Sequence, residues 1–227
     1  MKNIGEALSF PFKDPDWILK FLIGGIVGLL SMILIGIPVL FGYYIELVQR
    51  LRRNEPKPLP EWNELGVKFI VGFKFLVTLF VYYTPLIIIT VPIFIMIIIA
   101  SIQQSYVTGL FGSAALLTLI FLVMIPYSLL ISILTPIISV QYAERESIGD
   151  GLHIGKLFRL FKAHWQDALI ATLITIGVET LSAIGIIFFI VGVLFTSFYA
   201  SLIRFHLYGQ IAQTIQESAS HSTPRAV

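Results

Sequence analysis

Four long apolar stretches constrain what this chain can fold into more than any other feature of its sequence. Each is longer than thirty residues, and they cover 18–48, 67–100, 109–140 and 168–203. One helix crosses the hydrocarbon core of a membrane with about 20 residues, because the core is about 30 Å thick and a helix rises about 1.5 Å per residue. Each stretch is therefore predicted to be either a tight helical hairpin or one long helix that is kinked or tilted.

The composition agrees with a chain that is surrounded by lipid. Hydrophobic residues make up 57% of the sequence and charged residues 12%, whereas an ordinary soluble domain has about 25% charged residues. These values exclude a soluble globular enzyme, a disordered chain and a fibrous protein. The chain has no cysteine, which excludes disulfides, thiol catalysis and cysteine-ligated metal centres.

The placement of the cations favours hairpins in the first and last stretches. The fifteen Lys and Arg residues fall near the N-terminus, in 50–74, in 145–162 and near the C-terminus, and the connector 101–108 holds no charge. Cytoplasmic loops are rich in Lys and Arg, and hairpins that turn near 35–38 and 181–185 put all the cations on one side. We therefore expect an all-α integral membrane protein with about six membrane segments, two helical hairpins plus two long kinked helices, and both termini cytoplasmic. Four kinked spans are the alternative.

Several residues beside the apolar stretches predict local contacts. Asp14, Pro15 and Asp16 are predicted to begin a helix, with Asp14 as its cap and Pro15 in its first turn. Glu46 and Arg50 are four residues apart and predict an ion pair on one helix. Four glycines are predicted to allow close contacts between helices: Gly28, Gly36, Gly42 and Gly192.

The segment 147–165 is predicted to include an amphipathic helix on the cytoplasmic side. Apolar side chains repeat along one stripe at Ile154, Leu157, Phe158, Phe161 and Trp165. The other side carries Lys156, Arg159 and Lys162. We expect these cations to contact lipid headgroups while the helix lies in the membrane plane. The alternative is a cytoplasmic helix that packs on the rest of the bundle.

The chain also contains a weak internal repeat. Residues 4–8 read Ile-Gly-Glu-Ala-Leu and residues 148–152 read Ile-Gly-Asp-Gly-Leu, and each is followed by a tryptophan and then by a predicted hairpin. We predict a single polytopic membrane domain, 1–227, with repeat units 3–53 and 147–213. Many membrane folds are built from such repeats, with a substrate site at the interface between them.

Four polar residues are candidates for function: Glu179, Lys74, His206 and Tyr208. Glu179 lies inside the last apolar stretch, where an ionisable side chain is costly and is a functional hypothesis by default; the alternative is that it reaches water near the outer turn. Lys74 is expected to reach the cytoplasmic face along its aliphatic stem. His206 and Tyr208 are expected either to face a cytoplasmic opening or to anchor the chain at the interface. No motif for a catalytic, cofactor or metal site appears, and no basic–aromatic patch for nucleic acid.

Two functions of different classes are consistent with these residues. The first is a non-enzymatic accessory or scaffold subunit that interacts with membrane lipids and with other membrane-protein subunits or a second copy of the chain. The second is a small solute or ion transporter, or a channel component, with Glu179 in its pathway. Few polar residues occur deep in the apolar stretches, which favours the first. An enzyme of lipid metabolism is a distant third.

Two groups of residues resemble a known family. The sequence from Gly42 to Arg50 is followed by Leu-Pro-Glu-Trp at 59–62, and the chain later reads His-Leu-Tyr-Gly-Gln at 206–210. These elements resemble the prokaryotic "domain of unknown function 4013" family of small polytopic membrane proteins, over nearly the whole chain. The resemblance implies a bacterial or archaeal cytoplasmic membrane, and it supplies no activity and no catalytic residues.

Overall fold

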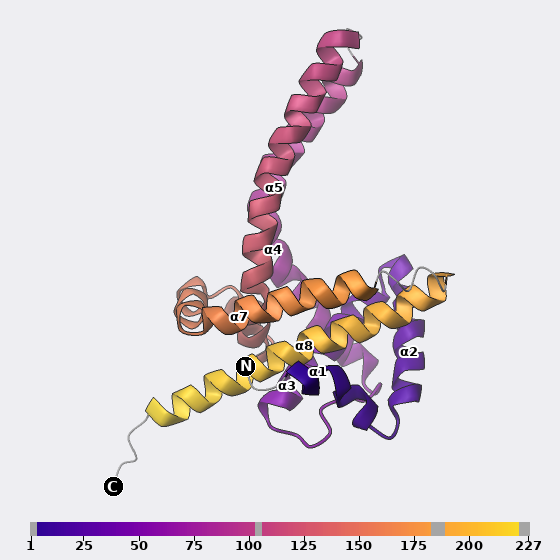
Figure 1. Ribbon diagram of the computed structural model, residues 1–227, viewed down its shortest axis with the longest axis vertical. Coiled ribbons are helices and arrows are strands. Elements are labelled where there is room, and N and C mark those ends of the chain that lie inside the picture. The colour runs from indigo at the N-terminus through magenta and orange to yellow at the C-terminus, as the bar shows by residue number, and fades with distance from the viewer. Residues whose placement is uncertain (1–3, 103–105, 183–188, 223–227) are drawn as a thin grey trace. The chain divides into compact units, whose positions relative to one another are not determined.

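The computed structural model describes residues 4–102, 106–182 and 189–222. These residues form helices joined by turns and contain no strand (Figure 1), so the prediction of an all-helical chain is confirmed for them. In chain order the elements are α1 (Ile4–Ser9), η1 (Phe10–Lys13), α2 (Trp17–Leu30), η2 (Ser31–Ile33), α3 (Gly36–Arg52), α4 (Leu65–Ile102), α5 (Tyr106–Ala143), α6 (Ile148–Gly151), α7 (Ile154–Ser182) and α8 (Phe189–Ser222).

The chain divides into two compact units. Unit 1 comprises Met1–Thr78 and Leu134–Val227, and unit 2 comprises Leu79–Ile133. The long helices α4 and α5 therefore each contribute one part to unit 1 and one part to unit 2.

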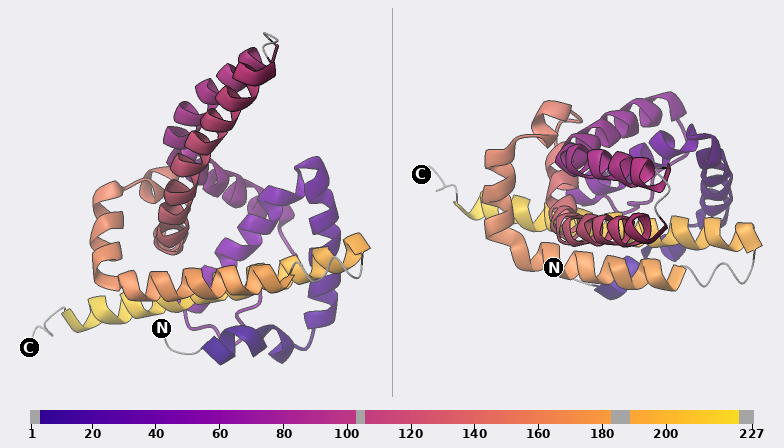
Figure 2. Two further views of the ribbon diagram at one scale, coloured as in Figure 1. Left: turned by 45° about the horizontal axis from the view of Figure 1, so that its top comes forward. Right: turned by 90° about the horizontal axis from the view of Figure 1, so that it is seen from above.

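Unit 1 is organised around α8. This helix packs against α2, α3 and α7, and α2 also packs against α3. Figure 2 shows α7 and α8 side by side, with α2 crossing α8. The contact between α3 and α8 is largely aromatic and aliphatic: Tyr44 stacks on Phe205 with ring centroids 4.9 Å apart, and Ile45, Val48 and Leu202 are buried. Burial of these side chains supplies the main stabilisation of the unit.

The first predicted hairpin is present as a helical hairpin. The chain leaves η2 through Leu34, which has φ 66°, and α3 begins at Gly36. A Cβ atom at Gly36 would lie 2.1 Å from the carbonyl oxygen of Val27, so only glycine allows the two helices to approach this closely. Pro38 lies in the first turn of α3, where a missing N–H removes no helical hydrogen bond. The prediction of a turn at this place, and of Gly36 as a close contact, is confirmed.

The second hairpin is formed by α7 and α8. Most of its predicted turn, 181–185, lies outside the described residues. The helix α7 is bent at His164, which has the non-helical angles φ −128° and ψ 25°. Both predicted repeat units open on a short helix, α1 in one and α6 in the other. The repeat itself stays a prediction.

Unit 2 consists of the remaining parts of α4 and α5. The Tyr127 hydroxyl donates a hydrogen bond of 2.6 Å to the carbonyl of Tyr82 and so links the two helices. The helix α4 continues through Pro85 and Pro92. Most of the large apolar side chains described in this unit are exposed, among them Ile88 and Leu122.

Two described segments are long and apolar enough to cross a membrane. They are Leu65–Ile99 and Ala114–Ala143. A third candidate arises if Ile4–Lys13 and Trp17–Ile33, which are bent by 98° at the break between them, count as one broken span. By length and composition the described residues thus hold two or three candidate spans, and not clearly six.

Candidate functional site

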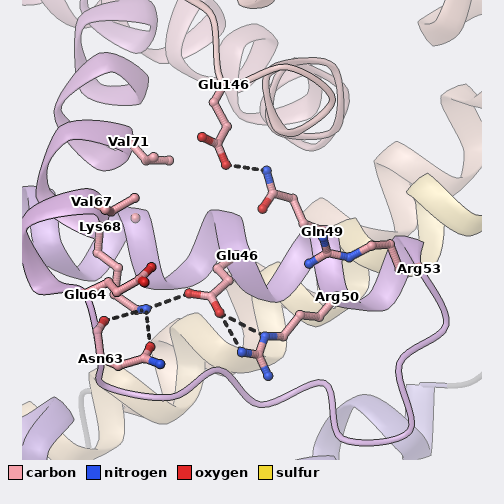
Figure 3. A pocket seen from close by; sticks show the side chains of 11 residues that line it. Glu46, Gln49, Arg50, Arg53, Asn63, Glu64, Val67, Lys68, Val71 and Glu146 are labelled. Carbon is pink, nitrogen blue, oxygen red and sulfur yellow. Dashed lines mark hydrogen bonds and ion pairs between the residues drawn. The ribbon is translucent and has the colours of Figure 1, made fainter.

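A polar cavity of about 300 Å³ lies in unit 1, beside the C-terminal half of α3 and the start of α4 (Figure 3). Its lining includes charged residues that are far apart in the sequence: Glu46, Arg50, Arg53, Glu64, Lys68 and Glu146. The cavity is therefore created by the tertiary packing of the helix ends, and the contacts within it decide what it can bind.

Glu46 is the centre of the charges in this cavity. One of its carboxylate oxygens accepts from Arg50, with Nε at 2.9 Å and Nη2 at 2.8 Å, and the other lies 2.7 Å from the Lys68 ammonium. Lys68 also donates to the carbonyl of Asn63 at 3.0 Å. Its side chain is only 5% exposed, and these partners offset the loss of water around its charge. The predicted Glu46–Arg50 pair is confirmed, and Lys68 is an addition that sequence spacing did not indicate.

Two glycines bring Glu46 and Lys68 together. A Cβ at Gly42 would lie 1.9 Å from the Lys68 carbonyl oxygen, and a Cβ at Gly72 would lie 1.8 Å from the Pro38 carbonyl oxygen. Any side chain at either position would therefore push α3 away from α4. Gly42 of α3 lies beside Lys68 of α4, and the earlier Pro38 lies beside the later Gly72. The two helices therefore run antiparallel at this crossing. The prediction of Gly42 as a close helix contact is confirmed.

The ends of α3 and α5 are linked by hydrogen bonds and ion pairs near the cavity. Gln49 donates to Glu146 at 2.7 Å and to the last carbonyl of α5 at 3.0 Å. Glu144 forms ion pairs with Arg52, at 3.4 Å, and with Lys156 of α7. One carboxylate thus connects α3 to α7. The charged and polar side chains at these helix ends are together called the charged layer.

A second buried charge cluster lies at the start of α2. The Lys20 ammonium is 2.9 Å from Asp14 and 2.5 Å from Glu61, and Lys20 is only 3% exposed. Trp62 donates its ring N–H to the Lys20 carbonyl at 2.8 Å. Asp14 accepts from the Asp16 N–H at 2.9 Å, so it closes a local turn and does not cap α2. The prediction of Asp14 as the helix cap was wrong for α2, because this helix begins at Trp17 and Asp16 holds its N-cap position, without a side-chain capping bond.

The pKa of Asp14 lies below its usual range. Burial alone would raise it, but the hydrogen bonds from Lys20 and from the Asp16 N–H, together with the Lys20 charge, outweigh the burial. The only sequence signal for this cluster was a lysine inside the first apolar stretch, and its partner Glu61 is 41 residues away.

The structure does not bring the four candidate residues into one site. Glu179 of α7 pairs with Arg204 of α8, so it has a counter-charge within the chain. Lys74 is exposed on α4, and no ion pair is described for it. Its backbone carbonyl accepts from Thr78 at 3.0 Å.

His206 and Tyr208 belong to the core of unit 1. His206 is 2% exposed, and its ring lies against Phe10 with centroids 4.2 Å apart. Burial lowers the pKa of His206 to about 4, with a smaller contribution from Lys13. Tyr208 is buried against Phe205, with ring centroids 5.2 Å apart. In the described structure neither side chain faces an open surface.

The cations predicted to contact headgroups differ in their surroundings. Lys156 is half-buried and bound to Glu144, whereas Arg159 and Lys162 are exposed on the first part of α7. No ion pair is described for Arg159 or Lys162 within the ranges that the structure covers.

A second cavity, of about 280 Å³, is apolar and lies between α2, α3 and α8. Small residues line part of it, including Gly24, Gly28 and Ser201. A Cβ at Gly28 would lie 3.3 Å from a Leu194 methyl carbon, which agrees with the predicted close contact at this glycine.

The polar cavity contains no arrangement that suggests a chemical reaction. Its central carboxylate, Glu46, is paired with the two nearest cations, Arg50 and Lys68. Among the described residues no group of three or more His, Cys, Asp and Glu could hold a metal ion. The arrangement fixes the positions of the helix ends.

Comparison with known proteins yields one match. No curated protein and no solved structure matches this chain. A family model described as "Protein of unknown function (DUF4013)" matches residues 25–196, from within α2 to within α8. The matched part includes the Gly42–Arg50 and Leu59–Trp62 elements, whereas His206–Gln210 lies beyond it. Because the match covers most of the sequence, the chain belongs to the DUF4013 family.

Proposed function

We propose that this protein is a non-enzymatic accessory or scaffold subunit of a prokaryotic cytoplasmic membrane that interacts with lipids. Its partners are membrane lipids and other membrane-protein subunits or a second copy of the chain. The helices α4 and α5 each cross the bilayer once, the hairpins α2–α3 and α7–α8 enter it from the cationic side, and both termini are cytoplasmic. This gives six membrane segments.

The observation that carries the proposal is the exposed apolar tip of the first hairpin. Met32, Ile33, Leu34 and Ile35 are consecutive and all exposed, Met32 by 72%. The face of α2 that leads to this tip is also apolar and exposed, with Ile18, Leu22 and Ile26 on it. Contiguous apolar surface of this kind marks a membrane or protein contact, and a hairpin tip inside the hydrocarbon core would remove it from water.

The antiparallel crossing of α3 and α4 supports a limited depth for this hairpin. Gly42 lies at the level of Lys68 and Pro38 at the level of Gly72. The tip at Leu34 precedes Glu46 by about twelve residues, or about 18 Å at about 1.5 Å per residue. If the charged layer around Glu46 lies at the headgroups, the tip reaches about the middle of a hydrocarbon core that is about 30 Å thick.

The state of the charged residues supports an accessory role over a catalytic one. The cavity carboxylate Glu46 forms ion pairs with Arg50 and Lys68. The contacts made by Gln49, Glu144 and their partners hold helix ends in place. A polar layer of this kind suits a docking or organising surface.

The topology is tested by cysteine labelling, since the chain has no cysteine of its own. Asn54→Cys is expected to react with a membrane-impermeant maleimide only from the cytoplasmic side. Met32→Cys is expected to react from neither side until detergent is added. Labelling of Asn54→Cys from outside, or of Met32→Cys in intact membranes, would contradict the proposal.

The accessory role is tested with protein extracted gently from its native membrane. Native mass spectrometry is expected to show a mass above 25.4 kDa, from bound lipid, a second copy or another subunit. The bare monomer alone would contradict the role.

Transport through a path containing Glu179 remains the alternative. It predicts ion or solute flux in proteoliposomes that is lost in Glu179→Gln. The pairing of Glu179 with Arg204 supports a structural role instead, for which we expect no flux above that of protein-free vesicles.

A further inference from the structure

The first part of α7 is an arm with an exposed apolar edge. It comprises residues 154–163, before the bend at His164. Ile154 and Phe158 are each 60% exposed, and Trp165, just after the bend, is also exposed. Leu157, by contrast, is buried within unit 1. The apolar stripe expected from the sequence is therefore divided, with one edge packed on the protein and the other edge free.

The unpaired cations of the arm adjoin its free apolar edge. At 3.6 residues per turn, successive residues are separated by about 100° around the helix. Phe158 is thus about 40° from Ile154, Lys162 about 80° and Arg159 about 140°. The exposed surface of the arm therefore changes from apolar to cationic within about half a turn, and residues 154–163 include no acidic residue.

Lys156, the third cation of the arm, makes an ion pair within the protein. Lys156 is bound to Glu144, which also pairs with Arg52 of α3. These ion pairs attach the arm to the end of α3 and to the segment after α5, and so fix which face the arm exposes. Arg159 and Lys162, for which no ion pair is described, are available to bind an external anion.

We infer that this arm is a docking surface for anionic phospholipid headgroups in the leaflet on the cationic side of the protein. Ile154 and Phe158 lie at the boundary of the acyl chains, Arg159 and Lys162 contact headgroup phosphates, and Trp165 lies at the same interface. The inference rests on the proposed membrane function and names the lipid class that the protein selects.

A lipid surface fits this arm better than a protein partner. The free edge combines exposed large apolar side chains with two unpaired cations, which is the composition of helices that lie in the interface plane. An anionic leaflet supplies negative charge along the whole arm, so the two cations need no specific acidic residue opposite them.

The test measures contact between the arm and defined lipids in the reconstituted full-length protein. Gly155→Cys carries a bimane fluorophore, because Gly155 is exposed and a Cβ there meets no atom within 4 Å. The vesicles contain phosphatidylcholine and phosphatidylglycerol, with bromine on the chains of one or the other. Brominated phosphatidylglycerol is expected to quench the fluorophore more strongly than brominated phosphatidylcholine.

The variant pair tests the two cations. Arg159→Gln with Lys162→Gln is expected to bring the preference for phosphatidylglycerol close to one, since each cation near a membrane surface contributes about fivefold. The control, Lys57→Gln with Arg145→Gln, removes the same charges from exposed positions elsewhere and is expected to keep the preference. Salt at 1 M is expected to weaken the preference, because the screening length falls to about 3 Å.

Three results would overturn the inference. Equal quenching by both lipids would remove the anionic preference. Absence of quenching at Gly155→Cys, together with strong quenching of a reporter at Met32→Cys, would show that a protein partner or a second copy covers the arm, and it would leave the membrane proposal intact. Absence of quenching at both positions would contradict the membrane proposal itself.

Discussion

The buried imidazole of His206 makes the stability of unit 1 sensitive to acid. Its pKa is about 4 in the folded chain against 6.5 for an unperturbed histidine, so the unfolded chain binds a proton more readily between these values. Stability is therefore fully present above pH 6.5 and is lost as the pH falls toward 4, by about 3 kcal/mol in total. The measurement is the unfolding midpoint in detergent from pH 7.5 to 4.5.

His206→Gln is expected to flatten this pH dependence. The matched control is His153→Gln, because His153 is exposed, and it should keep the wild-type slope. A slope that persists in His206→Gln would show that another group is responsible.

Loss of the Lys20 ammonium is expected to destabilise unit 1. Lys20→Met leaves the Asp14 carboxylate buried without its cation, and breaking a buried pair in this way costs about 3 kcal/mol. The matched control is Lys74→Met, which removes an exposed cation and should change the free energy of unfolding by less than about 0.5 kcal/mol. Adding Asp14→Asn to Lys20→Met should restore part of the loss. If the double variant lost the sum of both single effects, the two residues would not be coupled.

At the scale of elements, the crossing of α3 and α4 depends on having no side chain at Gly42. Gly42→Ala places a Cβ 1.9 Å from the Lys68 carbonyl oxygen, and we expect it to destabilise the protein by about 3 kcal/mol or more, because the opposing group is backbone and cannot turn aside. Gly177→Ala is the matched control, since nothing lies within 4 Å of its Cβ. It should be neutral or stabilising by about 0.5–1 kcal/mol through helix propensity. Equal effects of the two changes on thermal unfolding would refute the close crossing.

The elements themselves could largely be predicted, whereas most of the side-chain contacts between distant elements could not. Long apolar runs are enough to predict helices, and Gly36 with Pro38 is enough to predict the first turn. The ion pair of Glu46 with Arg50 follows from helical spacing. The partners Lys68 and Glu61 are set by how distant helices and loops pack, and no periodicity of one segment contains that information.

The candidate residues show the same limit. His206 was expected at an opening or an interface because its ring is polar, but Phe10 and the surrounding core bury it. Glu179 was a functional candidate because it lies in an apolar stretch, with contact to water near the outer turn as the alternative, but Arg204 lies close to it across the hairpin. Sequence spacing identifies a costly side chain and gives no information about a partner on another helix.

At the scale of the whole molecule, unit 1 should retain its fold without unit 2. The parts of α4 and α5 that belong to unit 1 are held together there. The Tyr142 hydroxyl donates to the Val71 carbonyl at 2.6 Å, and the Tyr142 ring lies 5.1 Å from the Phe75 ring. A variant in which a Gly/Ser linker replaces Leu79–Ile133 is therefore expected to keep a cooperative unfolding transition and the acid sensitivity that His206 confers.

The same variant decides whether the hairpins are membrane segments in their own right, because it lacks most of the two helical segments that are long enough to cross a membrane. If the exposed tip from Met32 to Ile35 lies in hydrocarbon, the variant should stay with the membrane through an alkaline carbonate wash. Changing Met32, Ile33 and Leu34 to Asn should release it, since each exposed apolar side chain then no longer gains from leaving water. Release of the variant while it still unfolds cooperatively would limit the membrane segments to α4 and α5, and unit 1 would then be a layer bound at the surface.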